Sequence, residues 1–182
     1  MDLPVVQQRK KDHLYSVFIK RWTEELQGLF CIENEDWVVL KAVYSDFIMD
    51  GILLINKKYI SSIKREEKEE FKEKVLFITN KPNITTCPEL FNNPDLFTTL
   101  SANKTLIQIH LHKEFEFFVG IIIKVNDNSI VLKLLNPKGI WLKNDTKNFD
   151  KDKIRIIHVG ADYAHSLLAY SRTLNDPERG IK

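Results

Sequence analysis

The chain contains an internal repeat whose two copies lie 92 positions apart. Residues 14–43 align with residues 106–135 without a gap. Seven aligned pairs are identical: Leu14/Leu106, Glu24/Glu116, Gly28/Gly120, Asn34/Asn126, Val39/Val131, Leu40/Leu132 and Lys41/Lys133. A repeat with two long copies differs from a solenoid, which stacks several short units. We therefore expect two tandem domains of similar structure.

Each copy has the sequence pattern of β-strands. Apolar and other side chains alternate over 14–20 and again over 106–112, as in strands with one face in a core. Two more strand signals follow in each copy, joined by short turns rich in Asn and Asp. The third strand signal, at 37–43 and 129–135, is apolar at nearly every position. This is typical of a strand that bends across both layers of a small barrel.

The repeat is expected to resume after a variable loop. Residues 51–56 align with 139–144, which puts Trp141 at the position of Leu53 and predicts a core side chain there. Residues 145–152 then form a long loop in the second copy. The segments 59–63 and 153–157 are the expected last strands.

Helical patterns flank the strands. Residues 65–77 and 160–170 show helical spacing of apolar side chains, a third helix is expected over 93–104, and residues 3–11 occupy the same place before the first copy. For the helix over 93–104, Asn93 is the expected N-cap and Pro94 the first helical residue.

The fold class predicted is mainly β, with two tandem small antiparallel five-stranded barrels, each with short flanking helices. Four segments follow from the pattern: a first barrel at 1–79, a linker with three prolines at 80–94, a second barrel at 95–170 and a polar tail at 171–182.

A helix followed by five bent antiparallel strands, with a glycine early in the second strand (Gly28 and Gly120), resembles the Sm-like family of small barrels. Barrels of the Src-homology-3 or Tudor type are alternatives. The Sm family binds RNA through two short motifs, an Asp-x-apolar-Asn turn and an Arg-Gly pair. The segments at 36–39 and 127–130 lack that Asn, and neither copy has the Arg-Gly pair. The resemblance therefore implies the barrel and no RNA-binding residues. Because Sm-like barrels associate through their edges, two barrels in one chain predict a monomer or dimer.

Composition excludes several classes of function. The net charge of +2 does not indicate a surface dedicated to nucleic acid or membrane. No long uncharged apolar run and no signal-peptide pattern is present, which predicts a cytoplasmic protein without a membrane segment. Cys31 and Cys87 are then expected to be reduced thiols, with Cys31 in the core.

The sequence contains no pattern typical of an enzyme, so no catalytic residue and no cofactor is predicted. His110 and His112 are weak candidates for metal ligands, because residues i and i+2 of a strand share a face. His158, Glu114 and Glu116 are candidates for a third ligand. The favoured interpretation is that the two histidines lie on an outer strand face, either exposed to solvent or covered by the other domain.

Aromatic and basic residues are the candidates for partner binding: Trp22, Trp37, Lys57, Lys58, Lys147 and Lys151. For the two tryptophans, burial at the contact between domains is favoured over an exposed anchor for a protein partner or a base-stacking platform. The lysines have acidic neighbours, as on an ordinary solvated surface. We expect a non-catalytic protein-binding module, such as an immunity or regulatory protein. The alternative is an Sm-like protein that binds RNA or single-stranded nucleic acid.

Overall fold

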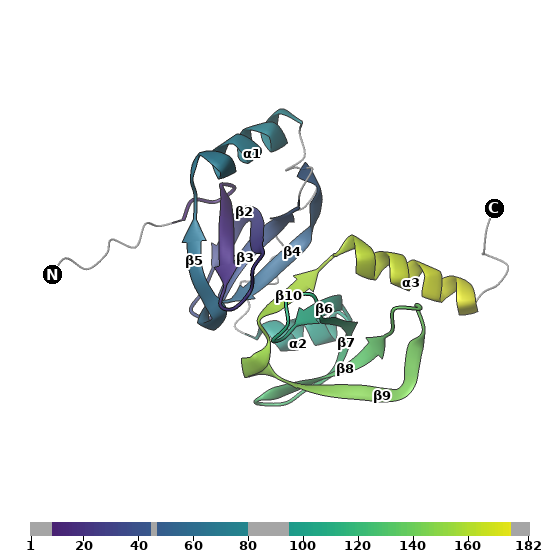
Figure 1. Ribbon diagram of the computed structural model, residues 1–182. Helices are drawn as coiled ribbons and strands as arrows, with labels where there is room; N and C mark the ends of the chain where they lie inside the picture. Colours follow the sequence, from purple (N-terminus) through teal and green to yellow (C-terminus); the bar gives the residue numbers. More distant parts are fainter. Residues whose placement is uncertain (1–8, 45–46, 80–94, 176–182) are drawn as a thin grey trace.

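The computed structural model describes residues 9–44, 47–79 and 95–175 (Figure 1). The first half of the chain forms five strands, a short 3-10 helix and one α-helix: β1 Leu14–Ile19, β2 Glu25–Glu33, β3 Trp37–Val43, β4 Met49–Asn56, η2 Lys57–Tyr59, β5 Ile60–Lys64 and α1 Glu67–Ile78. The second half repeats this order after an additional helix: α2 Leu96–Ala102, β6 Leu106–His110, β7 Phe117–Val125, β8 Ser129–Leu135, β9 Trp141–Asp150, η5 Lys151–Lys153, β10 Ile156–Val159 and α3 Asp162–Asn175. The mainly β prediction is confirmed.

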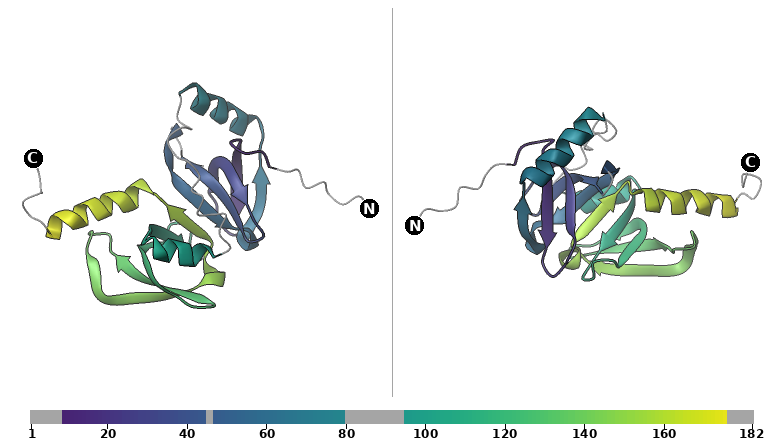
Figure 2. Two further views of the ribbon diagram at one scale, coloured as in Figure 1. Left: turned by 180° about the vertical axis from the view of Figure 1, so that it is seen from behind. Right: turned by 45° about the horizontal axis from the view of Figure 1, so that its top comes forward.

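The strands form one antiparallel sheet that runs through both halves. Its order is β5-β1-β2-β3-β4-β10-β6-β7-β8-β9, so each half has the same internal order. The halves join where β10 pairs with both β4 and β6. Figures 1 and 2 show the strands as two adjacent groups that meet at β4 and β10. Two separate tandem barrels are not confirmed, because the ten strands belong to a single open sheet.

The predicted repeat is visible in the strand register. Leu14 pairs with Leu29 in the first half, and Leu106 pairs with Ile121 in the second. A β-bulge follows at the same place in both halves, between Phe30 and Ile32 and between Ile122 and Lys124. The gap-free alignment of the first three strands is therefore confirmed at the level of individual pairs.

The predicted alignment of the fourth strands is wrong. Ile52 pairs with Lys41, and the residue that pairs with Lys133 is Thr146, so Gly51 corresponds to Asp145 and not to Gly139. The expected long loop at 145–152 is largely the end of β9. Trp141 pairs with Leu135 at the start of β9, as Met49 does with Val43. It is only partly buried, against the cluster under α3.

The hydrophobic core is shared between the halves. Along β4, Leu53 and Ile55 pack into a cluster made mainly by the first half. Ile52 and Leu54 point to the opposite face and pack with residues of α2 and the second half. Every residue of β3 is buried. Trp37 and Val39 pack into the shared cluster, while Val38, Leu40 and Ala42 point to the opposite face and pack into the cluster of the first half. The prediction from the apolar pattern of β3 was a bend across a single barrel; the finding is a strand covered on both faces.

Cys31 lies in the shared core, as predicted. It is disulfide-bonded, so the expected reduced thiol is wrong at this position. Cys87 lies outside the described residues.

The predicted helices at 65–77, 93–104 and 160–170 are confirmed, with differences at their ends, whereas most of the segment 3–11 lies outside the described residues. α2 is capped by Asp95, whose side chain accepts a hydrogen bond from the Thr98 N–H at 3.1 Å. The expected cap, Asn93, lies outside the described residues, as does the whole of the predicted linker 80–94. α3 extends to Asn175, and Ser171 is buried, so the first part of the predicted polar tail is helical.

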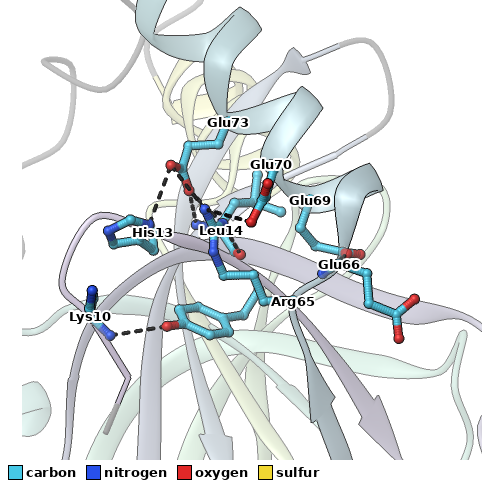
Figure 3. A network of polar contacts seen from close by, with 9 residues as sticks. Lys10, His13, Leu14, Arg65, Glu66, Glu69, Glu70 and Glu73 are labelled. Carbon is cyan, nitrogen blue, oxygen red and sulfur yellow. Dashed lines mark hydrogen bonds and ion pairs between the residues drawn. The ribbon is translucent and has the colours of Figure 1, made fainter. Parts of the chain in front are cut away.

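A polar network joins α1 to β1 (Figure 3). The Glu73 carboxylate accepts hydrogen bonds from the Leu14 N–H at 2.7 Å and from Nη1 of Arg65 at 2.7 Å. His13 Nδ1 lies 3.4 Å from the same carboxylate. Glu73 therefore satisfies a backbone donor of β1 and a guanidinium that are both largely shielded from water.

Replacing Glu73 with alanine is expected to lower the free energy of unfolding by about 2 kcal/mol, because it leaves the Leu14 N–H and Arg65 without their acceptor. The matched control is Glu70→Ala, since Glu70 is half exposed and its carboxylate lies 3.9 Å from Arg65. That variant should change stability by less than about 0.5 kcal/mol. Urea unfolding of both variants measures the difference, and equal effects would contradict the role given to Glu73.

Candidate functional site

A cavity of about 590 Å³ lies where the two halves of the sheet meet, and we call it the junction cavity. Strands β2, β4, β6, β7 and β10 all contribute to its wall. Leu53 of β4 and Ile156 of β10 are the buried apolar part of that wall. Because β10 is paired between β4 and β6, the cavity exists only when the two halves are joined.

Two loops close the junction beside this cavity. The Trp22 indole Nε1–H, in the loop before β2, donates a hydrogen bond to the His112 carbonyl at 3.0 Å. In the loop before β7, the Glu114 carboxylate accepts hydrogen bonds from Thr23 N–H at 3.2 Å, Thr23 Oγ1 at 2.8 Å and Glu24 N–H at 2.5 Å. These contacts fix the cavity wall across the two halves.

Aromatic side chains form a row along the wall. The ring centroid of His110 lies 5.9 Å from that of Trp22 and 5.3 Å from that of Phe117. Tyr44 and Phe115 complete the aromatic lining, and their side chains are 44% and 79% exposed. Such exposure places apolar rings where a ligand that enters from solvent would contact them.

The structure shifts the pKa values of His110 and Glu114, two ionisable groups of the wall. Burial lowers the pKa of His110 to about 4, so its ring is neutral. Burial opposes the charged form of Glu114, but the hydrogen bonds from Glu24 and Thr23 outweigh it and lower the pKa of this carboxyl. Glu114 is therefore a carboxylate.

The wall carries an excess of negative charge. Glu24, Glu25 and Glu114 contribute three carboxylates, and Lys72 contributes one ammonium group. Glu25 forms an ion pair with Lys68, and Lys72 Nζ donates a hydrogen bond to Gln27 Oε1 at 2.6 Å. No ion pair of the Glu24 carboxylate with another described residue is found.

Of the predicted partner-binding residues, Trp22 is the one that lines the junction cavity. Trp37 is buried in the shared core, 6.2 Å from the ring of Phe97 in an edge-to-face contact. Both tryptophans thus lie where the halves meet, which was the favoured interpretation.

The four predicted lysines lie elsewhere. Lys57 forms an ion pair with Glu33 at 2.7 Å, and Lys58 lies 3.3 Å from Asp152. The other two lie over aromatic rings of the second half: Lys147 Nζ is 3.8 Å from the centroid of Phe118, and Lys151 Nζ is 5.2 Å from that of Phe97. The structure does not bring these lysines together.

The histidine pair is not arranged as a metal site. β6 ends at His110, so His112 does not share its strand face. His112 Nδ1 accepts a hydrogen bond from the Arg155 guanidinium at 3.2 Å, and His110 Nδ1 faces the Glu114 carbonyl at 3.4 Å. His158 is buried with Nε2 at 2.6 Å from the Asp50 carbonyl. Among the described residues, no group of three or more His, Cys, Asp or Glu side chains could hold a metal ion.

Sequence reasoning missed most of the cavity lining, including its aromatic residues Tyr44, Phe115 and Phe117 and its acidic residue Glu24. Glu114 was considered only as a metal ligand. A usable signal exists in the repeat, because Trp22 aligns with Glu114 and Thr23 with Phe115.

A second, wider groove of about 1010 Å³ lies beside β1 and β5. Arg9 and Lys57 pair with Glu33, and Arg65 pairs with Glu73 of α1. These pairs stabilise the fold, and the junction cavity, with its row of aromatic side chains, is the better candidate.

Comparison of the chain with protein-family models, with curated proteins and with solved structures finds no match. None of the helices in residues 9–44, 47–79 and 95–175 has the length and apolar character needed to span a bilayer.

Proposed function

We propose that the protein is a non-catalytic binding module that holds a side chain of a protein partner in the junction cavity. The observation that carries the proposal is the aromatic wall between the two halves, with Phe115 79% exposed at its rim. Exposed aromatic side chains beside a concave apolar site are typical anchors in protein interfaces. An immunity or regulatory protein would use such a site.

The alternative, binding of RNA or single-stranded nucleic acid, has less support. Lys57 and Lys58 are paired with Glu33 and Asp152, and the wall of the junction cavity is acidic. A nucleic-acid ligand would require a positive groove along its backbone.

The same strand order in both halves supports a further part of the proposal, that each half is a small-barrel unit similar to the Sm-like family. Pairing of β4 with β10 uses one edge of each unit inside the chain. This supports a monomer or dimer.

Selection of a random peptide library on the immobilised chain tests the proposal. Selected peptides should lose at least about tenfold in affinity when Phe115 is replaced by aspartate, because a charged side chain removes an apolar anchor from the rim. Isothermal titration calorimetry measures the affinities.

The matched control is Ile78→Asp. Ile78 is 81% exposed at the end of α1 and does not line the junction cavity. Peptides that bind both variants as tightly as the original chain would contradict the proposal.

A further inference from the structure

Three features of the junction cavity concern the chemistry of its occupant. Its walls are aromatic, its carboxylates outnumber its ammonium groups by three to one, and its histidine is neutral. All three features bear on which charge a bound group can carry.

The aromatic walls favour a cation. The face of an aromatic ring carries partial negative charge, so it attracts an ammonium or guanidinium group placed over it. The protein already uses this contact nearby: the Arg155 guanidinium lies 4.7 Å from the centroid of Tyr59 and 6.0 Å from that of Trp22. The Trp22 ring therefore already has one guanidinium of the protein, that of Arg155, over it.

The carboxylates of the wall also favour a cation. Glu114 is held ionised by its three hydrogen bonds, and Glu24 makes no ion pair with another described residue. Glu25 is paired with the exposed Lys68, and Lys72 is the one ammonium group of the wall. An occupant with a positive charge would neutralise this excess, whereas a carboxylate or phosphate would be repelled.

From these features we infer that the group held in the junction cavity is a cationic side chain, with arginine preferred over lysine. The inference rests on the proposed function, since it names the partner side chain that the binding module recognises. A guanidinium stacks flat on aromatic rings and donates hydrogen bonds to carboxylates in its plane, which an ammonium group cannot do. Glu24 and Glu114 are its acceptors, and Trp22 and Phe117 contribute the rings.

Single-residue probes test the charge requirement. The full chain is titrated with N-acetyl-arginine methylamide and with the citrulline derivative, which has nearly the same shape and no charge. The indole N–H resonance of Trp22, assigned with Trp22→Phe, reports binding. The arginine derivative should bind at least about tenfold more tightly than the citrulline derivative, and raised salt should weaken it.

Glu24→Gln should weaken the arginine derivative about three- to tenfold, because it removes a carboxylate from the wall. Glu35→Gln is the matched control, since Glu35 is exposed in the turn between β2 and β3, away from the cavity. Equal effects of the two variants would overturn the role of Glu24.

Two further probes separate the remaining outcomes. If the leucine derivative binds as tightly as the arginine derivative, the inference fails while the proposed function stands. If spermidine matches the arginine derivative and arginine-containing peptides bind no more tightly, the site takes a free cation and the side-chain inference fails. If no probe moves the Trp22 resonance and library selection gives no peptide dependent on Phe115, both proposals fail.

Discussion

Replacing Gly51 with alanine is expected to lower the free energy of unfolding by about 3–5 kcal/mol, because the added methyl group overlaps backbone atoms and forces a side chain onto a left-handed backbone. Gly51 lies in β4 with a φ of +67°, and a Cβ there would lie 2.3 Å from the Val159 carbonyl oxygen. It would also lie 2.7 Å from the Gly160 carbonyl carbon. Both neighbours are backbone atoms at the end of β10, so the overlap cannot be relieved by rotating a side chain.

Gly160→Ala is the matched control. Gly160 has a similar φ of +75°, but a Cβ there would meet its nearest neighbour, the Cα of Gly51, at 3.6 Å. This variant incurs only the cost of a left-handed backbone with a side chain, about 1–2 kcal/mol. The difference between the two variants measures how closely β4 and β10 approach. Urea unfolding measures both variants. Equal destabilisation by the two substitutions would contradict the expectation that the close approach of β4 to β10 at Gly51 adds to the loss of stability.

The same variant tests whether the halves fold as one unit. Because β4 places alternate side chains in both clusters of the core, we expect one unfolding transition for the whole chain. In Gly51→Ala, hydrogen exchange should accelerate most at the amides of β10, which pair with β4. Two separate transitions in the unaltered chain would contradict the shared core.

Local strand patterns were predictable from the sequence, because alternation depends only on neighbouring residues. The first three strands of each half were therefore placed at the right segments, and their gap-free alignment holds in the strand register, where Gly28 and Gly120 occupy equivalent positions. The contact between halves was not predictable in this way. It depends on the pairing of β4 with β10, which lie about one hundred positions apart, as in Ile55 with Ile156.

The fourth strand shows how one residue type can mislead an alignment. Gly51 and Gly139 both have a positive φ, of 67° and 69°, and both follow a variable loop. Their environments differ, since a Cβ at Gly139 would lie 2.8 Å from the Tyr170 ring of α3. Two glycines needed for different contacts look alike in the sequence, and this shifted the alignment of β9.

The candidate site was partly predictable. Trp22 was correctly predicted to lie at the contact between the halves. His110 was considered as a metal ligand together with His112, but β6 ends at His110 and the two side chains do not share a strand face. Phe115 was missed because a single aromatic residue in a polar loop has no periodic pattern around it. Its exposure and its position beside the cavity follow from the tertiary structure alone.

Acidification is expected to weaken the protein through His110. Burial lowers the pKa of His110 to about 4 in the folded chain, against an ordinary value of 6.5. The folded state therefore favours the neutral ring, and this contribution to stability is fully present above pH 6.5 and is lost as the pH falls toward 4. The loss from this residue reaches about 2 kcal/mol at pH 5 and about 3 kcal/mol below pH 4.

His110→Phe removes the titrating group and keeps an aromatic ring, as the aligned Phe18 does in the first half. Urea unfolding at several values between pH 7 and pH 5 should show that the free energy of unfolding depends less on pH in this variant than in the original chain.

Other groups also contribute to the pH dependence. Burial also lowers the pKa of His158, so some dependence of the same sign remains. The carboxyl groups with lowered pKa values, such as Glu69 and Glu114, lose their contribution mainly below this interval. His165→Gln, on the exposed face of α3, should leave the dependence unchanged. If His110→Phe and the original chain lose stability equally between pH 7 and pH 5, protonation of the His110 ring is not the cause of the loss.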